Sequence, residues 1–162
     1  MNKLWIALGI AGVSVFTAAP VLAAQPPATT FIAVMTAAQE VPKCAPATNA
    51  FCGVAVFHVI NEATGTVEFK LVANNLPGVI IAAHIHIAPK GVAGPILQPL
   101  PPTPGVEHGV IATGIFTNPG LVAAIRAHPD NYYVNVHTGP PGVGCPAGVI
   151  RGQLGDHGPL NQ

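Results

Sequence analysis

Glycine and proline divide this chain into short segments, and this constrains its fold more than any other feature. The 162 residues include 18 glycines and 18 prolines, although half of the chain is hydrophobic. Short apolar runs separated by frequent turns are typical of β-sandwiches and barrels rather than helical bundles. We therefore predict an all-β fold, a Greek-key-like antiparallel β-sandwich or barrel with one short helix.

The N-terminal sequence has the three regions of a secretory signal peptide. Lys3 provides a positive end, the run LWIALGIAGVSVF is apolar, and small residues precede a cleavage position after Ala23 or Ala24. No later segment has the roughly 18 uninterrupted apolar residues of a transmembrane helix. We expect residues 1–23 to be the signal peptide and residues 24–162 to form a single domain that is secreted or periplasmic.

Charge and residue usage exclude several functional classes. Six basic and six acidic residues give zero formal net charge, so the chain lacks the basic surface expected for binding nucleic acid or an anionic membrane. The region after the signal peptide contains no serine, which argues against a serine hydrolase. Cys44, Cys52 and Cys145 allow three alternative disulfides, and the sequence does not distinguish between them.

Alternating hydrophobicity marks the expected strands. Val67, Phe69 and Leu71 alternate with polar residues, and the run 66–73 follows 53–60 closely enough to form a hairpin. The one helix signal begins at Asn118, an N-cap residue followed by proline. Further strands are expected at 31–41, 79–88, 108–116, 132–138 and 149–154, while 89–107 is a long Pro-rich excursion.

Two histidines share one face of the expected strand 79–88. Ile81, Ile85 and Ile87 fall on one face, which we expect to pack inward, and His84 and His86 fall on the other. Residues two apart on a strand lie roughly 6 to 7 Å apart, so both imidazoles can reach one ion.

A third histidine has the same setting. His137 alternates with apolar residues in the strand 132–138, and it would complete a three-histidine site for Cu or Zn if that strand adjoins 79–88. His108 is a possible additional donor. Asn135 and Tyr133 share the face of His137 and are possible outer partners that orient the imidazoles. Arg151 needs a partner in so uncharged a chain, and Glu40 is one candidate for a structural salt bridge.

Five ordered segments resemble the CHRD domain, a module named after chordin and found in exported bacterial proteins. They are TAAQEVP (36–42), IIAAHIHIAP (80–89), GPI (94–96), YYVNVHT (132–138) and GVIRGQL (148–154). The resemblance implies an extracellular all-β domain without established enzymatic activity. The chain departs from the pattern in its cysteine-bearing segments and at Ile87, where the family often has glycine.

Three functions remain open from the sequence. The leading prediction is a non-catalytic protein that binds Cu or Zn through His84, His86 and His137. The first alternative is a structural or interaction module without metal, whose excursion 89–104 contacts an extracellular or envelope protein. The second is a small copper-dependent redox enzyme. It is suggested by a fold-level analogy to copper-zinc superoxide dismutases, whose further zinc ligands are replaced here by Pro-rich sequence.

Overall fold

Eight strands and one α-helix make up the described part of the chain. The computed structural model describes residues 27, 29–44, 50, 52–140 and 144–155, so the predicted signal peptide lies outside the described residues. The strands are β1 Thr30–Thr36, β2 Cys52–Asn61, β3 Thr66–Asn74, β4 Val79–Ile87, β5 Ile96–Pro99, β6 Gly109–Thr117, β7 Tyr132–Gly139 and β8 Ile150–Gln153. The helix α1 is Pro119–Ala127, and the short 3-10 helices are η1 Ala37–Gln39 and η2 Pro129–Asn131.

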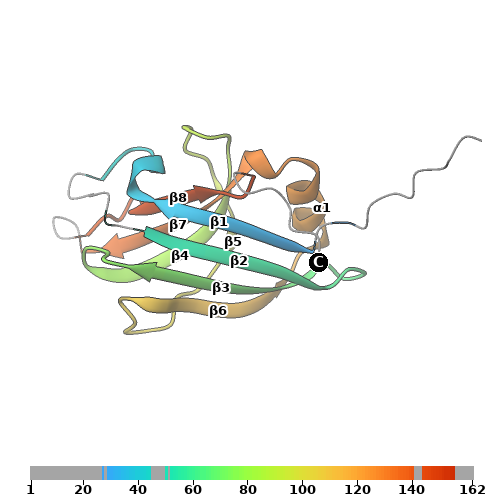
Figure 1. The fold of residues 1–162 in the computed structure, drawn as a ribbon, viewed down its shortest axis with the longest axis horizontal. Helices are drawn as coiled ribbons and strands as arrows, with labels where there is room; N and C mark the ends of the chain where they lie inside the picture. Colours follow the sequence, from blue (N-terminus) through green and yellow to red (C-terminus); the bar gives the residue numbers. More distant parts are fainter. Residues whose placement is uncertain (1–26, 28, 45–49, 51, 141–143, 156–162) are drawn as a thin grey trace, which may run out of the picture.

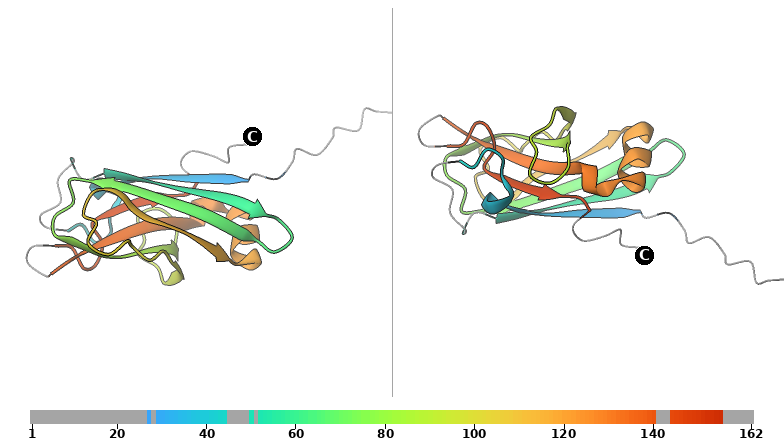
Figure 2. Two further views of the ribbon diagram at one scale, coloured as in Figure 1. Left: turned by 90° about the horizontal axis from the view of Figure 1, so that it is seen from below. Right: turned by 90° about the horizontal axis from the view of Figure 1, so that it is seen from above.

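The strands form one curled antiparallel sheet in the order β5-β4-β7-β8-β1-β2-β3-β6. Strands β1, β2, β3 and β6 make one layer, and β8, β7, β4 and β5 lie behind them (Figures 1 and 2). The strands β2 and β3 form the expected hairpin. The predicted all-β class, with antiparallel pairing and one short helix, is therefore confirmed.

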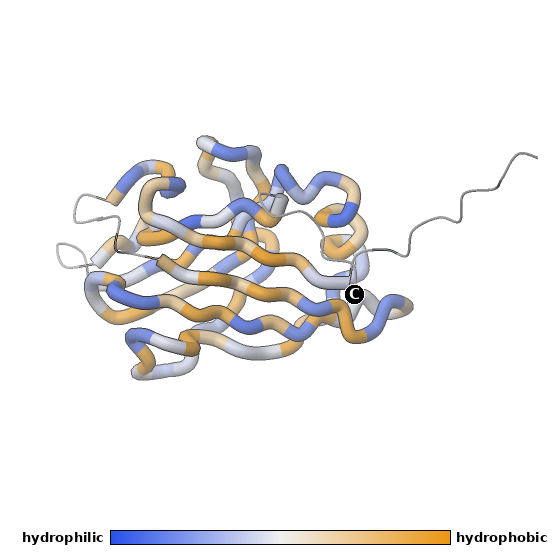
Figure 3. Tube along the Cα trace, viewed as in Figure 1, coloured by the Kyte–Doolittle hydropathy of each residue, from blue (hydrophilic) through white to orange (hydrophobic). Residues whose placement is uncertain are grey.

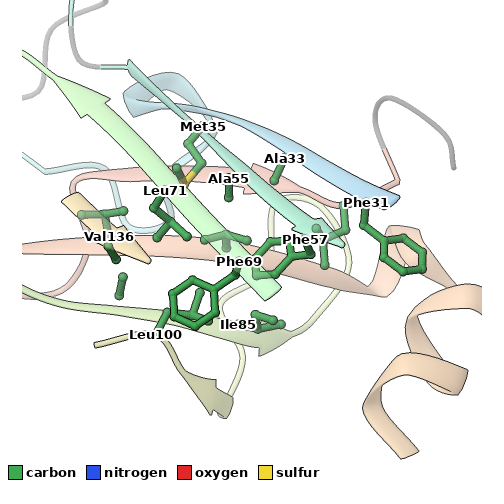
Figure 4. Packing of buried hydrophobic residues seen from close by; sticks show 14 of the residues in the cluster. Phe31, Ala33, Met35, Ala55, Phe57, Phe69, Leu71, Ile85, Leu100 and Val136 are labelled. Atoms are coloured by element: carbon green, nitrogen blue, oxygen red, sulfur yellow. The ribbon is translucent and has the colours of Figure 1, made fainter. Parts of the chain in front are cut away.

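The hydrophobic core fills the space between the two layers. Hydropathy alternates along the strands (Figure 3), and the inward residues Val67, Phe69 and Leu71 of β3 are at most 3% exposed. Opposite them, Ile85 and Val136 come from the second layer (Figure 4). Burying one large apolar side chain stabilises the folded state by about 1.5 to 3 kcal/mol. The packing between the two layers therefore holds the sheet in its curled form.

Helix α1 closes one end of the curled sheet (Figure 1). The side chain of Asn118 accepts a hydrogen bond of 3.0 Å from the Leu121 amide, which is the predicted N-cap. One face of the helix buries Leu121, Val122 and Ile125 against the core. Among the described residues, no helix is both long and apolar enough to cross a membrane.

The prediction that three isoleucines of β4 pack inward is only partly right. Ile85 is fully buried, but Ile81 is 54% exposed and Ile87 is 37% exposed. The pairing of β4 with β7 shifts between Ile80 and Ala82, so Ile81 is an extra residue that changes which side chains face inward. Ile87 is the last residue of the strand.

The Pro-rich excursion contains a short edge strand. Strand β5 pairs with β4 alone and forms one edge of the sheet, which is a position that tolerates proline. The Leu100 amide donates to the Ala83 carbonyl, and the Leu100 side chain is fully buried. The Pro-rich excursion therefore packs against the sheet and adds an edge strand to it.

One of the three possible disulfides is present. Cys44 is bonded to Cys145, with the Cα atoms 5.8 Å apart, and Cys52 is a free, exposed cysteine. The bond joins the chain after η1 to the segment before β8.

Candidate metal centre

The pairing of β4 with β7 brings the three predicted histidines together. His84 lies opposite Asn135, and His86 lies opposite Tyr133. His137 lies opposite Ala82, so it is on the same sheet face as His84 and His86. The adjacency of the two strands on which the sequence prediction depended is therefore present.

The three imidazoles form a compact group. His84 Nδ1 is 3.2 Å from His137 Nε2, and one nitrogen of each ring lies within 4.8 Å of the others. Two nitrogens bonded to one ion at about 2.0 to 2.1 Å can be at most about 4.2 Å apart. A bound ion therefore requires one ring to move inward by a fraction of an ångström or more.

Backbone carbonyls fix the proton positions on two of the rings. His86 Nδ1 is 2.9 Å from the Gly94 carbonyl oxygen, and His137 Nδ1 is 3.0 Å from that of Pro146. A carbonyl only accepts, so each Nδ1 carries the hydrogen and each neutral ring keeps its lone pair on Nε2. His84 Nδ1 then donates to His137 Nε2. A hydrogen bond from the far ring nitrogen to a carbonyl is the usual contact that orients histidines around metals.

The group favours neutral imidazoles. Burial, as the largest cause, together with the neighbouring His137 and His86 lowers the pKa of His84 to about 4. Burial also lowers the pKa of His86 and of His137, although the carbonyl hydrogen bonds oppose this. Metals compete with protons for the same lone pairs, so a lowered pKa keeps the nitrogens available near neutral pH. His86 has no hydrogen-bond partner for its buried Nε2.

Tyr133 and Arg151 support the His86 ring from one side. The Tyr133 ring stacks on His86 with centroids 4.8 Å apart and an interplanar angle of 12°, and the guanidinium of Arg151 lies 3.5 Å from the Tyr133 centroid. The Tyr133 hydroxyl accepts a hydrogen bond of 3.0 Å from the Gly94 amide. The same glycine therefore contacts both Tyr133 and His86, and it fixes their relative position.

Arg151 holds a neighbouring segment in place instead of pairing with Glu40. We call residues 88–94 the covering segment. Arg151 donates hydrogen bonds of 2.7 and 3.0 Å to the carbonyls of Val92 and Pro89, and Gln153 donates one of 2.7 Å to that of Ala88. The predicted Glu40–Arg151 salt bridge is wrong. The two groups attract each other electrostatically, but the guanidinium forms its hydrogen bonds with these two carbonyls and with Gln153. The covering segment consequently buries the outer face of β8 and part of β7.

A buried carboxyl group lies beside Asn135. Asn135 Nδ2 is 3.3 Å from Glu40 Oε1, while Glu40 Oε2 and Asn135 Oδ1 are buried without a partner. Burial raises the pKa of Glu40 to about 7, against the lowering effects of the Val41 amide, Arg151 and Asn135. Gly148, at φ +134°, adjoins this pair, and a Cβ there would lie 2.6 Å from Glu40 Oε2.

The structure does not bring His108 into the histidine group. His108 lines a separate surface pocket with Asn74, Asn75, Leu76 and Glu107. Asn135 and Tyr133 do share the face of the histidines, as expected from their alternation, but both are almost fully buried. Their burial comes from segments outside the strands, which the alternation pattern does not describe.

Sequence reasoning missed three groups that shape the site, and it gave Glu40 a different partner. The missed groups are the carbonyls of Gly94 and Pro146 and the amide of Gln153. Glu40 was expected to pair with Arg151 and instead hydrogen-bonds to Asn135. Backbone carbonyls carry no residue-type signal, and Gln153 is a common residue type. Only the rarity of charged side chains, 7% of the chain, marked Glu40 and Arg151 as unusual.

Comparison with known proteins gives one match. The sequence model of the CHRD domain matches residues 31–154, which is more than half of the chain and includes all three histidines. No curated protein and no solved structure matches the chain.

Proposed function

Since the chain belongs to the CHRD domain family, we propose that it is a non-catalytic member that binds a Cu or Zn ion through His84, His86 and His137. The observation that carries this proposal is the pair of hydrogen bonds that sets which ring nitrogens of His86 and His137 carry a hydrogen. Two rings donate Nδ1 hydrogens to backbone carbonyls, so their Nε2 lone pairs are oriented before any ion binds. Neutral imidazole nitrogens are preferred ligands of both metals.

His84 is the ring that would adjust when an ion binds. It is more exposed than the other two and has no hydrogen bond to a backbone carbonyl among the described contacts, whereas His86 and His137 each have one. Its Nδ1 hydrogen points to His137 Nε2 in the metal-free arrangement. An ion would replace that hydrogen bond, so rotation or tautomer change of His84 accompanies binding.

A titration with matched variants tests the proposal. The purified protein is titrated with Cu(II) and with Zn(II) by calorimetry, next to the double variants His84→Ala/His86→Ala and His108→Ala/His128→Ala. The second variant removes two histidines outside the group and should bind like the parent protein. We expect the first to lose affinity by roughly 100-fold or more, because changes in the surrounding shell alone cost about 10- to 100-fold. Equal binding by all three proteins would disprove the site.

We also propose that the protein is exported. The N-terminal sequence pattern and the Cys44–Cys145 disulfide support this, because disulfides persist in oxidising compartments outside the cytosol. Cell fractionation followed by N-terminal sequencing tests the proposal, and a mature chain beginning at residue 24 or 25 is the expected result. Recovery of the protein in the cytosolic fraction with residues 1–23 still attached would contradict it.

A second candidate function is protein binding through the excursion. Val92, Ile96 and Leu97 are 50%, 51% and 41% exposed, and they lie on or next to the edge strand β5. An edge strand with exposed apolar side chains is a common site for a partner protein. Affinity capture from the exported fraction with the parent protein and an Ile96→Lys/Leu97→Lys variant tests this function. A partner retained equally by both would exclude this surface.

A further inference from the structure

The three histidines leave part of the coordination shell of a bound ion to ligands from solution. They all belong to one face of two adjacent strands. Zn(II) and Cu(II) take four or more ligands in proteins. Within the described ranges, no fourth histidine, cysteine or carboxylate joins the group. The nearby amide of Asn135 instead contacts Glu40, and the Tyr133 hydroxyl contacts Gly94.

The group is open to solvent at one of its members. His86 and His137 are only 6% and 9% exposed, whereas His84 is partly exposed. The segments that cover the face are attached at the other two rings, through Gly94 and Pro146. A ligand from solution can therefore reach the ion along the side of His84. The covering segment at His86 and the chain around Pro146 at His137 restrict this ligand to a small molecule.

The charge of the site favours an anion over a neutral ligand. The three protein donors are histidines, which bind a metal through a neutral imidazole, so a divalent ion keeps its full formal charge. Arg151, stacked on Tyr133 behind His86, adds a further positive charge. Electrostatic attraction is stronger in a partly buried site than in water. Glu40, the carboxyl group nearest Asn135, is partly protonated at neutral pH and offsets this charge only in part.

We infer that an ion held by His84, His86 and His137 takes a small monovalent anion from solution as a further ligand. This inference rests on the proposed function, and it deepens that function by naming the class of molecule the site receives. The coordination of such an anion forms a bond to the metal without transferring electrons, so it needs no other reactant.

The test uses the Cu(II)-loaded protein and azide as the probe. Sodium azide is titrated into the loaded protein while electron paramagnetic resonance and visible absorption are recorded, with sodium perchlorate at equal ionic strength as the control. We expect a saturable spectral shift with one azide per copper and no shift with perchlorate. The variant His108→Ala/His128→Ala should give the same shift, because it leaves the three-histidine group intact.

The outcomes distinguish the two claims. Copper binding that depends on His84 and His86, with spectra that azide leaves unchanged, overturns the anion inference and leaves the metal site standing. Copper binding that is equal in the protein and in His84→Ala/His86→Ala overturns the proposed function, and the inference falls with it.

Discussion

The ring of Tyr133 lies parallel to the imidazole of His86, 4.8 Å away and tilted by 12°. The two residues are opposite each other on β7 and β4, so the sheet register itself places one ring on the other. Gly94 hydrogen-bonds to both residues: its carbonyl accepts from His86, and its amide donates to the Tyr133 hydroxyl. A candidate ligand is thus held by strand pairing, ring stacking and a backbone contact together.

Replacing Tyr133 separates the effect of stacking from that of the hydroxyl. Tyr133→Phe keeps the ring, so we expect a small loss of stability, about 1 kcal/mol, from the lost hydrogen bond. Tyr133→Leu removes the ring, and the His86 imidazole loses its support. We expect the Zn(II) affinity of Tyr133→Leu to fall by about 10-fold or more, as is usual when a residue that orients a metal ligand is replaced. Calorimetry on both variants checks this, and equal affinities would show that stacking does not orient His86.

Acidification should destabilise the metal-free protein through His84. In the unfolded chain its pKa is near the ordinary value of about 6.5, and in the folded chain it is lowered to about 4 by burial and the neighbouring histidines. The unfolded state therefore binds more protons between these values, and stability falls as the pH falls from 6.5 towards 4. Urea unfolding at several pH values, compared with His84→Gln, should show the parent protein losing stability relative to the variant. A pH-independent difference would contradict this.

Glu40 should make the protein less stable as the pH rises, which is the opposite of the effect of His84. Its folded pKa is raised to about 7, mainly by burial, from an ordinary value of 4.5. The stability that it contributes is complete below pH 4.5 and is lost as the pH rises through about 7. Glu40→Gln cannot ionise, and its amide oxygen can still accept a hydrogen bond from Asn135 Nδ2. We expect this variant to exceed the parent protein in thermal stability at pH 8 and to match it more closely at pH 5. Parallel stability curves would exclude a raised pKa.

Arg151 should be the most sensitive position for the covering segment. Arg151→Met removes two charge-assisted hydrogen bonds to the covering segment, a third to Gln153 and the contact with Tyr133, which we expect to cost on the order of 3 kcal/mol. Arg151→Lys should restore little, because an ammonium group cannot span both carbonyls as the planar guanidinium does. Urea unfolding measures the cost, and trypsin cleavage after Lys90 reports release of the segment. Unchanged cleavage in Arg151→Met would show that the segment is held by other contacts.

The disulfide should contribute strongly to stability, because Cys44 and Cys145 are 101 residues apart in sequence. Loss of a bond that closes so long a loop costs roughly 2 to 5 kcal/mol. Cys44→Ser/Cys145→Ser should therefore unfold at markedly lower urea concentration than the parent protein. Cys52→Ser is the matched control, since Cys52 is free and exposed, and it should leave the midpoint unchanged. Equal midpoints for all three proteins would mean that the bond does not form.

Periodicity predicted much of this fold because strands such as β2 and β3 bury one face and expose the other, although β7 and β8 are buried on both faces. His84, His86 and His137 alternate with apolar residues along their strands. This alternation alone predicted that each of them lies on the face of its strand opposite the apolar residues. Their proximity depended on β4 pairing with β7, strands that are joined through β5, β6 and α1. Local patterns carry no information on such pairing. The exposure of Ile81 was missed for a similar reason, since a register shift depends on the partner strand.

The contacts of Arg151 lay beyond sequence reasoning in another way. A charged side chain in an uncharged protein suggests an oppositely charged partner, and Glu40 was the obvious one. Arg151 instead bonds to main-chain oxygens, which every residue has. Likewise, the choice of Cys145 as the partner of Cys44 depends on how η1 and the segment before β8 meet in space. Neither fact is encoded in a residue type.

The manner in which the covering segment is held has a consequence for how this protein can diverge. Arg151, Gln153 and His86 recognise only carbonyl oxygens in residues 88–94. Carbonyl oxygens are the same whatever the residue, so outward side chains such as Val92, which is 50% exposed, can be exchanged without disturbing these bonds. Gly94 and Gly91 are exceptions, because a Cβ at residue 94 would collide with the Ile87 carbonyl and Gly91 has a φ of +80°, which strains other residues. Related proteins can thus acquire new outer surfaces above an unchanged histidine group.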